Sequence, residues 1–206
     1  MPRIVPVCAA SFGANTYLLI SGNAAWVVDP SVSVDAILSA IRAEDAFPAG
    51  ILFTHGHFDH VLSADRLRGA LPSDEVYIHP KDAIMLTDGR KNAFYEFYRQ
   101  ERVFAPATRF FEDGQQLSLG ADTVTVLHTP GHSPGSVCLL WEDGLITGDT
   151  LFADNVGRWD LWGGSRVELE RSLARLRSLN PDLTIYPGHG NSARLGYALD
   201  EAAYYF

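Results

Sequence analysis

The chain has only two cysteines, Cys8 and Cys138, among 206 residues. Two cysteines are too few for a disulfide framework, and Cys138 lies in the apolar stretch SVCLLW, where a thiol behaves as a small hydrophobic side chain. Long apolar runs are missing too, because stretches such as 17–20 and 24–28 fall far short of the ~20 residues that cross a bilayer. The first ten residues have one basic residue and a proline, which fits a first strand better than a signal peptide. We therefore expect a cytoplasmic protein without a membrane partner.

Positive charge is scarce as well. The chain has 16 Lys and Arg against 25 Asp and Glu, a formal net charge of −9, and its basic residues form no run. Proteins that bind nucleic acid normally carry a basic patch, so we expect no nucleic-acid partner. Hydrophobic residues at 47% and charged residues at 20% exclude disordered, collagen-like and coiled-coil chains. The length fits a single domain over residues 1–206, as a monomer or a homodimer.

Apolar, β-branched runs alternate with helical patterns along the chain. Strands are predicted at 3–7, 16–20, 25–29, 51–54, 76–79, 116–119, 124–128, 136–141, 145–147 and 184–186. Helices are predicted at 34–43, 59–69, 167–179 and 193–203. The turn Glu142-Asp143-Gly144 predicts a hairpin. This mixture predicts a layered α/β or α+β domain with two sheets.

The segment from residue 80 to residue 111 differs in composition. It is partly helical in pattern and rich in aromatic residues, which include Tyr95, Tyr98 and five phenylalanines. Aromatic residues at helical spacing usually belong to a core, so one interpretation is a pair of helices packed on the sheets. The alternative is a lid or substrate wall, in which Tyr95 and Tyr98 would contact the substrate.

The strongest chemical signal is the sequence ILFTHGHFDH, which ends at His60. An apolar strand is followed directly by His55, His57, Asp59 and His60. Imidazole and carboxylate groups bind zinc or iron. Alternate side chains of an extended loop point to the same side, and His60 would lie in the first turn of the next helix. The four side chains can therefore serve two neighbouring metal sites rather than one.

Three later segments share one design, an apolar strand with a ligand-type side chain at its carboxyl end. They are TVTVLHTPGHSPGS with His132, GLITGDT with Asp149 and LTIYPGHG with His189. Sites in sheet proteins gather at these strand ends, and neighbouring glycines allow close approach to a bound ion. The sequence therefore predicts a metal centre. His79 and His128 lack this context and are interpreted as structural.

HGHFDH, TPGHSPGS, TGDT and YPGHG, in this order and spacing, resemble the motifs of the metallo-β-lactamase superfamily. Within it the chain is similar to short, single-domain bacterial members of the glyoxalase II (hydroxyacylglutathione hydrolase) branch. The resemblance extends through ANTYLL, VVDP, VGRWDLWGGS and LGYALDEAAYYF. It implies an αββα sandwich with two mixed sheets and helices on the outer faces.

The resemblance also implies two divalent metal ions, with zinc favoured and iron or manganese as alternatives. It divides the ligands so that His55, His57 and His132 bind the first ion, Asp59, His60 and His189 bind the second, and Asp149 bridges both. Such a pair of ions lowers the pKa of bound water from about 15.7 to ~7, and the hydroxide attacks a carbonyl. Asp59 would also orient this nucleophile. The implied function is a binuclear thioesterase that cleaves S-2-hydroxyacylglutathione-type thioesters.

Some features differ from the two-domain enzymes of this branch. The chain ends without their helical domain, which helps to hold glutathione, and Trp159 and Trp162 replace the usual Thr and Pro. Contacts that bind the substrate would then come from Arg158 or from cations near residues 88–111, namely Arg90, Lys91, Arg99 and Arg102. The simpler interpretations are a solvated face for these cations and a structural ion pair of Arg158 with Asp160.

Two further activities fit the same motifs. A lactonase of this fold shares the HxHxDH core and needs an apolar pocket, which the aromatic residues of 91–111 could line. A mononuclear iron dioxygenase that acts on persulfides keeps only the ligands of the first metal. Thioester, lactone and persulfide chemistry therefore stay open at this point.

Overall fold

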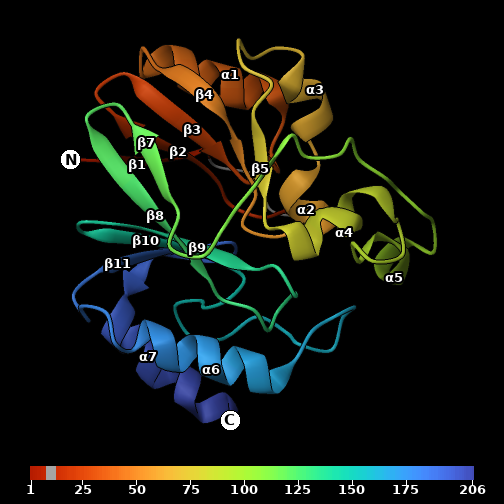
Figure 1. Cartoon of the computed structure of the whole chain (residues 1–206), viewed down its shortest axis with the longest axis vertical. Coiled ribbons are helices and arrows are strands. Elements are labelled where there is room, and N and C mark those ends of the chain that lie inside the picture. Colours follow the sequence, from red (N-terminus) through yellow and green to blue (C-terminus); the bar gives the residue numbers. More distant parts are fainter. Residues whose placement is uncertain (8–12) are drawn as a thin grey trace.

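Two six-stranded sheets face each other in the centre of the molecule (Figure 1). The computed structural model describes residues 1–7 and 13–206, so Cys8 lies outside the described residues, whereas Cys138 is a buried free thiol. The first sheet contains β1 (Arg3–Val7), β2 (Thr16–Ser21), β3 (Ala24–Val28), β4 (Phe47–Leu52), β5 (Val76–Ile78) and β6 (Arg109–Phe110), in this order. The second, in the order β12 to β7, contains β7 (Gln116–Leu119), β8 (Asp122–His128), β9 (Val137–Trp141), β10 (Gly144–Gly148), β11 (Thr184–Pro187) and β12 (Ala193–Arg194).

Both sheets are mixed. Strands β1 to β3 are antiparallel and β3 to β6 are parallel. In the second sheet β7 to β10 are antiparallel, and β11 is parallel to β10. Trp141 pairs with Gly144 across the predicted hairpin turn. Because parallel strands run in one direction, β4, β10 and β11 are each followed by a loop that carries predicted ligands.

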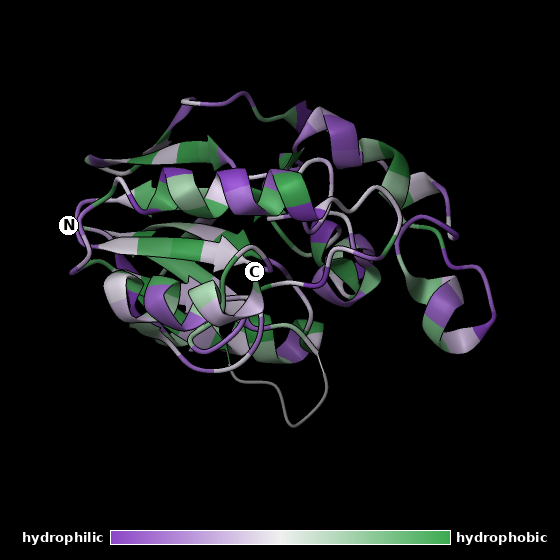
Figure 2. Cartoon of the chain, turned by 90° about the horizontal axis from the view of Figure 1, so that it is seen from below, coloured by the Kyte–Doolittle hydropathy of each residue, from purple (hydrophilic) through white to green (hydrophobic). Residues whose placement is uncertain are grey.

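Alternation along the strands separates the apolar residues into three layers. In β2, Leu18 and Ile20 face the helices that cover the first sheet, while Tyr17 and Leu19 face the second sheet. Both faces of the strands are thus buried, and Figure 2 shows strands that are mostly green along their length. The third layer lies between the second sheet and the C-terminal helices.

Helices cover the outer face of each sheet. On the first sheet lie α1 (Val34–Ala43), α2 (Phe58–Val61) and α3 (Ala64–Arg68), and on the second lie α6 (Arg166–Leu176) and α7 (Leu195–Ala202), followed by η2 (Ala203–Tyr205). Serine caps fix the starts of the two longest: Ser33 Oγ accepts from the Ala36 amide, and Ser165 Oγ accepts from the Glu168 amide. The predicted αββα sandwich is confirmed. Among the described residues, no helix has the length and apolar content of a membrane span.

The prediction of one helix over 59–69 is wrong. The segment forms α2 and α3, which are separated at Leu62 and Ser63. The Ser63 amide donates to the Pro30 carbonyl at 2.9 Å, and the Ser63 hydroxyl donates to the Val32 carbonyl. These bonds to the loop after β3 replace bonds within a helix, so the chain bends there.

The bounds of two strands also differ from the prediction. Strand β4 begins at Phe47, four residues before the predicted start at residue 51, and it includes Pro48 and Gly50. Residues 193 and 194, predicted as helix, pair with Ile185 and Thr184 and form β12. These strands depend on a neighbour that pairs with them, and no local pattern marks such a neighbour.

The segment 80–111 combines both of its interpretations. It contains η1 (Pro80–Asp82), α4 (Ala83–Thr87), α5 (Phe94–Tyr98) and the short strand β6. Phe104 and Phe111 are buried in the apolar layers, whereas Phe97 and Tyr98 are more than half exposed. Helix α5 projects from one end of the molecule (Figure 1). The segment is thus partly core and partly a wall beside the strand ends.

We expect Leu139→Ala to lower the free energy of unfolding by about 2–5 kcal/mol, because Leu139 is fully buried between the two sheets. Val167→Ala is the control, since that side chain is 55% exposed and should change stability by less than about 0.5 kcal/mol. Urea unfolding measures both. Equal stabilities of the two variants would contradict the assignment of this layer as the central core.

Candidate metal centre

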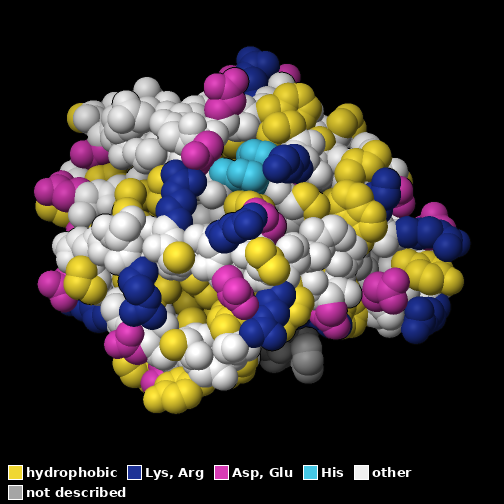
Figure 3. Space-filling view, turned by 60° about the horizontal axis from the view of Figure 1, so that its bottom comes forward, with side chains coloured by type: hydrophobic (Ala, Val, Ile, Leu, Met, Phe, Trp, Pro, Cys, Tyr) yellow, Lys and Arg dark blue, Asp and Glu magenta, His cyan; other side chains and the backbone are white. Residues whose placement is uncertain are grey.

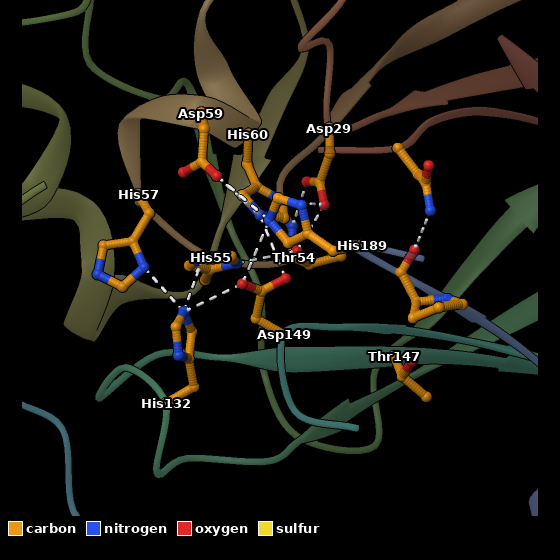
Figure 4. Close-up of polar contacts among 12 residues, drawn as sticks. Asp29, Thr54, His55, His57, Asp59, His60, His132, Thr147, Asp149 and His189 are labelled. Carbon is orange, nitrogen blue, oxygen red and sulfur yellow. Dashed lines mark hydrogen bonds and ion pairs between the residues drawn. The ribbon is translucent and has the colours of Figure 1, made fainter. Parts of the chain in front are cut away.

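All seven predicted ligands meet at one end of the sandwich (Figure 4). They come from the loop after β4, from α2 and from the loops after β8, β10 and β11. They form three overlapping groups whose ligand atoms lie within 4.8 Å of one another: His55, His57 and His132; His55, His60 and Asp149; and Asp59, His60 and His189. The two sheets thus contribute to one centre.

Three histidines form the more buried group. The Nε2 atom of His132 lies 2.8 Å from His57 Nδ1 and 3.2 Å from His55 Nε2. Two nitrogens bound to one tetrahedral zinc ion are about 3.4 Å apart, given Zn–N bonds of ~2.0–2.1 Å. The separation of 3.2 Å is close to this value, and that of 2.8 Å is shorter. The three rings, all nearly inaccessible to solvent, are therefore arranged to share one cation.

The second group is more open. Asp59 Oδ2 lies 3.2 Å from His189 Nε2 and 3.9 Å from His60 Nε2. His60 is fully buried, whereas the side chain of His189 is 38% exposed. Figure 3 shows histidine at the surface, bordered by cationic and apolar side chains. This group of two imidazoles and one carboxylate has access to solvent.

Asp149 lies between the two groups. Its Oδ1 is 3.3 Å from His60 Nε2, and its Oδ2 is 3.5 Å from His132 Nε2 and 3.6 Å from His189 Nε2. His60 Nε2 and Asp149 Oδ1 are buried, and neither has a hydrogen-bond partner among the described residues. Buried polar atoms normally have partners, so these two atoms suit a bound cation. The carboxylate can serve both groups at once.

Asp29 orients the ligands from behind. Its carboxylate lies 2.8 Å from His60 Nδ1 and accepts hydrogen bonds from the amide and hydroxyl of Thr54. The Thr54 hydroxyl is 3.2 Å from His55 Nδ1. With protons on both Nδ1 atoms, the Nε2 atoms of His55 and His60 keep their lone pairs for a metal. Asp29 lies in the VVDP motif, but it follows no His or Asp cluster that would mark it as a partner of metal ligands.

The loop after β10 packs closely on the centre. The backbone carbonyl of Arg158 lies 2.7 Å from His132 Nδ1 and can accept its proton, which leaves Nε2 free as a ligand. A Cβ atom at Gly157 would overlap the Asp149 carbonyl, and one at Gly188 would overlap the Asp149 carboxylate and the His60 ring. Glycine is therefore required at both positions.

The two groups differ in proton affinity. Burial lowers the pKa of His55 and His57 well below the usual value and also lowers that of His132. Burial opposes protonation of His60 as well, but Asp149, Asp29 and Asp59 outweigh it and raise its pKa well above the usual value.

The pKa values of the two carboxylates are low. Burial alone would raise both, but the neighbouring His60 lowers the pKa of Asp149 and of Asp59. Both carboxylates are therefore ionised at neutral pH. Ionised carboxylates are the form that binds a cation.

A cavity of about 420 Å³ opens over the centre. Besides ligands and Arg158, its lining is apolar and consists of Ala93, Phe97, Phe152, Val156 and Leu161. Tyr95 and Tyr98 are not among the lining residues, because α5 directs Phe97 to the cavity instead. Tyr98 contacts the Phe94 ring, and Arg90 stacks on Tyr95. Phe97 is thus the aromatic residue of α5 that lines the cavity, and a substrate contact by Tyr95 or Tyr98 stays a prediction.

Arg158 forms the ion pair considered from the sequence. Its guanidinium donates to both carboxylate oxygens of Asp160, at 2.6 and 2.8 Å, and both side chains are more than half exposed. Together with Arg90 they line an adjoining cavity of about 370 Å³. The other three candidate cations, Lys91, Arg99 and Arg102, do not line either cavity.

His79 and His128 lie outside the metal-ligand groups found among the described residues. Their rings stack with centroids 4.0 Å apart and planes 5° apart. Burial, together with His128, lowers the pKa of His79 to about 4. This stacked pair agrees with a structural role.

Comparison with known proteins gives one family. The model of the Metallo-beta-lactamase superfamily matches residues 11–189. An uncharacterized protein of Mycobacterium leprae is 39% identical over 204 residues, with 91% of each chain covered. The probable metallo-hydrolase YqgX of Bacillus subtilis is 34% identical, with 86% of this chain and 85% of that protein covered.

Two solved structures have closely similar folds. The crystal structure of BLEG-1 B3 metallo-beta-lactamase has a TM-score of 0.86 and 32% identity, with 97% of each chain covered. The crystal structure of TTHA1623 in a di-iron-bound form has a TM-score of 0.85 and 33% identity, with 97% of this chain and 99% of that chain covered. The similarity in fold thus extends over almost the whole chain.

Asp149→Ala should reduce the occupancy of both metal positions, because this carboxylate faces both ligand groups. We expect fewer than two tightly bound ions per chain after dialysis, measured by elemental analysis. Asp160→Ala removes an exposed carboxylate that contacts no ligand and should leave two ions bound. Two tightly bound ions in Asp149→Ala would show that the carboxylate is not shared.

The two positions should lose their metal at different pH values. His60 has a raised pKa, so protons compete for it first as the pH falls, at a cost of about tenfold in apparent affinity per pH unit below that pKa. His55, His57 and His132 have lowered pKa values and stay neutral to lower pH.

Zinc content after dialysis between pH 8 and pH 5 should therefore fall in two steps. The first step should be missing in His189→Ala, because this variant lacks one candidate ligand of the more open group. Loss of both ions in one step, or loss from the three-histidine group first, would contradict this order.

Proposed function

The chain belongs to the metallo-beta-lactamase superfamily, and on this basis we propose that it is a binuclear metal-dependent hydrolase that cleaves thioesters of the S-2-hydroxyacylglutathione type. The observation that carries the proposal is the position of Asp149, whose carboxylate lies within 3.6 Å of ligand atoms from both groups. A carboxylate shared in this way suits two cations a few ångströms apart. The related protein of Bacillus subtilis, named a probable metallo-hydrolase, supports the hydrolase class.

The donor set suits zinc best, because imidazole nitrogens and carboxylate oxygens are its usual ligands in hydrolases. Iron is the first alternative, since the same donors bind it and TTHA1623 is described in a di-iron-bound form. Manganese is a further alternative. When bound, the two ions supply a hydroxide at neutral pH and a Lewis acid for the substrate carbonyl.

Asp59 is placed to orient the attacking water. It lines the cavity, and one of its oxygens faces His189 while the other points away from it (Figure 4). The low pKa of Asp59 keeps the carboxylate ionised, so the free oxygen can accept a hydrogen bond from the nucleophile. In this proposal Asp59 would set the direction of attack.

The cavity wall suits a short acyl group. Phe97, Phe152, Val156 and Leu161 give the cavity an apolar wall beside the candidate ligands. A thiolate leaves readily at neutral pH because the pKa of a thiol is ~8.5, so the reaction needs no strong general acid. The cavity offers none among the described lining residues, which fits a thioester better than an amide.

The same apolar wall favours a lactonase as the second candidate. An acyl chain could lie along Phe97 and Phe152, and a lactone carbonyl would meet the same nucleophile. The two activities differ in the leaving group, which is an alkoxide in a lactone and needs more stabilisation than a thiolate.

Steady-state kinetics of the metal-loaded protein distinguish the candidates. S-Lactoylglutathione, a coenzyme A thioester and a homoserine lactone are compared, and oxygen uptake is followed with glutathione persulfide. We expect the highest kcat/KM with lactoylglutathione, no oxygen uptake, and a high KM. A higher kcat/KM on the lactone would favour the lactonase, and persulfide-dependent oxygen uptake with one iron per chain would favour the dioxygenase.

Asp59→Asn should lower kcat on lactoylglutathione at least about 100-fold, because the amide cannot replace the carboxylate as an acceptor. Metal content is measured in the same samples to separate loss of metal from loss of the acceptor. Asp45→Asn is the control, since Asp45 is exposed and its left-handed backbone conformation tolerates asparagine. Full activity of Asp59→Asn with both ions bound would exclude the proposed role.

A further inference from the structure

A buried carboxylate outside the ligand set joins two of the loops that supply ligands. Asp82, the last residue of η1, has no exposed surface. Its Oδ2 accepts hydrogen bonds from the Gly56 amide at 3.1 Å and the Ser133 hydroxyl at 2.6 Å, and its Oδ1 accepts one from the Gly135 amide at 2.5 Å. One loop follows β4 in the first sheet, and the other follows β8 in the second.

These donors lie next to the three-histidine group. Gly56 separates His55 from His57, and Ser133 directly follows His132. On the other side of the ligands, the two sheets are joined by a bond from the Val137 amide to the Thr54 carbonyl at 2.9 Å. The hydrogen bonds of Asp82 are a second connection between the two loops, in addition to this backbone hydrogen bond.

Close packing leaves the carboxylate little freedom. A Cβ atom at Gly135 would lie 2.7 Å from the Asp82 carboxyl group, and one at Gly56 would lie 2.7 Å from Met85 and 3.0 Å from the Asp82 carbonyl. Ser133 is held in turn, since its hydroxyl lies 2.7 Å from the Ser136 hydroxyl. The loops therefore meet Asp82 in direct contact.

Burial of an ionised carboxylate at this position costs free energy. Burial raises the pKa of Asp82 to about 6, although its three donors favour the ionised form. Asparagine, its neutral isostere, has one acceptor oxygen in place of two. The two acceptor oxygens are what three donors from two separate loops require.

We propose that Asp82 is a positioning residue, which sets the separation of the two loops and thereby prearranges His55, His57 and His132 for one metal ion. The inference rests on the metal centre of the proposed function. It assigns to the start of the 80–111 segment a role in metal affinity, in addition to the wall that α5 forms. Residues that orient ligands in this way typically contribute 10- to 100-fold to metal affinity.

The test is the zinc affinity of each position, measured by competition with a chromophoric chelator, with cobalt absorption spectra as a second readout. Asp82→Asn keeps the size of the side chain but leaves at least one donor unpaired. We expect 10- to 100-fold weaker binding at the three-histidine group and an altered cobalt spectrum, with a smaller change at Asp59, His60 and His189. Ser133→Ala, which removes one of the three donors, should weaken the same position less.

Ile37→Ala is the control for a purely structural effect. Ile37 is a fully buried residue of α1 and packs in the apolar layer between that helix and the first sheet, so this variant loses stability without touching the loops. Its zinc affinities should equal those of the unaltered chain. Unchanged affinities in Asp82→Asn would overturn the inference, and if that variant does not fold, unchanged affinities in Ser133→Ala would do so. A parent chain that binds no divalent cation would instead overturn the proposed function itself.

Discussion

Face-to-face packing of the two sheets is the constraint on which the rest of the structure depends. Leu19, Leu139 and their neighbours form an apolar layer between the sheets, and this layer sets how far apart the strand ends lie. The ligands from the loop after β4 belong to one sheet, whereas His132, Asp149 and His189 follow strands of the other. A centre shared across this seam exists only because the layer holds both sheets in register.

The same packing creates an electrostatic problem that a cation solves. Burial of His55, His57 and His132 makes them poor bases, and burial of Asp149 would be costly without positive charge beside it. Asp29 can accept a hydrogen bond from Nδ1 of His60, and the Arg158 carbonyl can accept one from Nδ1 of His132. Each of these contacts leaves the lone pair of an Nε2 atom directed towards the centre. The orientation of the imidazole rings and the charge of the carboxylate therefore both favour a bound cation.

The segment 80–111 connects the apolar core to the site. Asp82 at its start contacts the loops that carry ligands, Asn92 accepts from the Phe58 amide at the start of α2, and Phe97 lines the cavity. Because the segment is tied at both places to the loops that carry the candidate ligands, its aromatic wall is held beside these loops. The cavity wall and the candidate metal centre are thus connected through one piece of chain.

Sequence alone determined the layered fold, most strand positions and the seven candidate metal ligands, because strand periodicity and the spacing of His and Asp after strand ends are local signals. Tertiary structure alone decided the break between helices at Ser63 and the pairing that forms β12. It also decided that Phe97, rather than Tyr95 or Tyr98, lines the cavity. It also brought Asp82 to Gly56, Ser133 and Gly135, which are distant in sequence. Each of these depends on a partner that only the packing of the two sheets supplies, and no periodicity along the chain records such a partner.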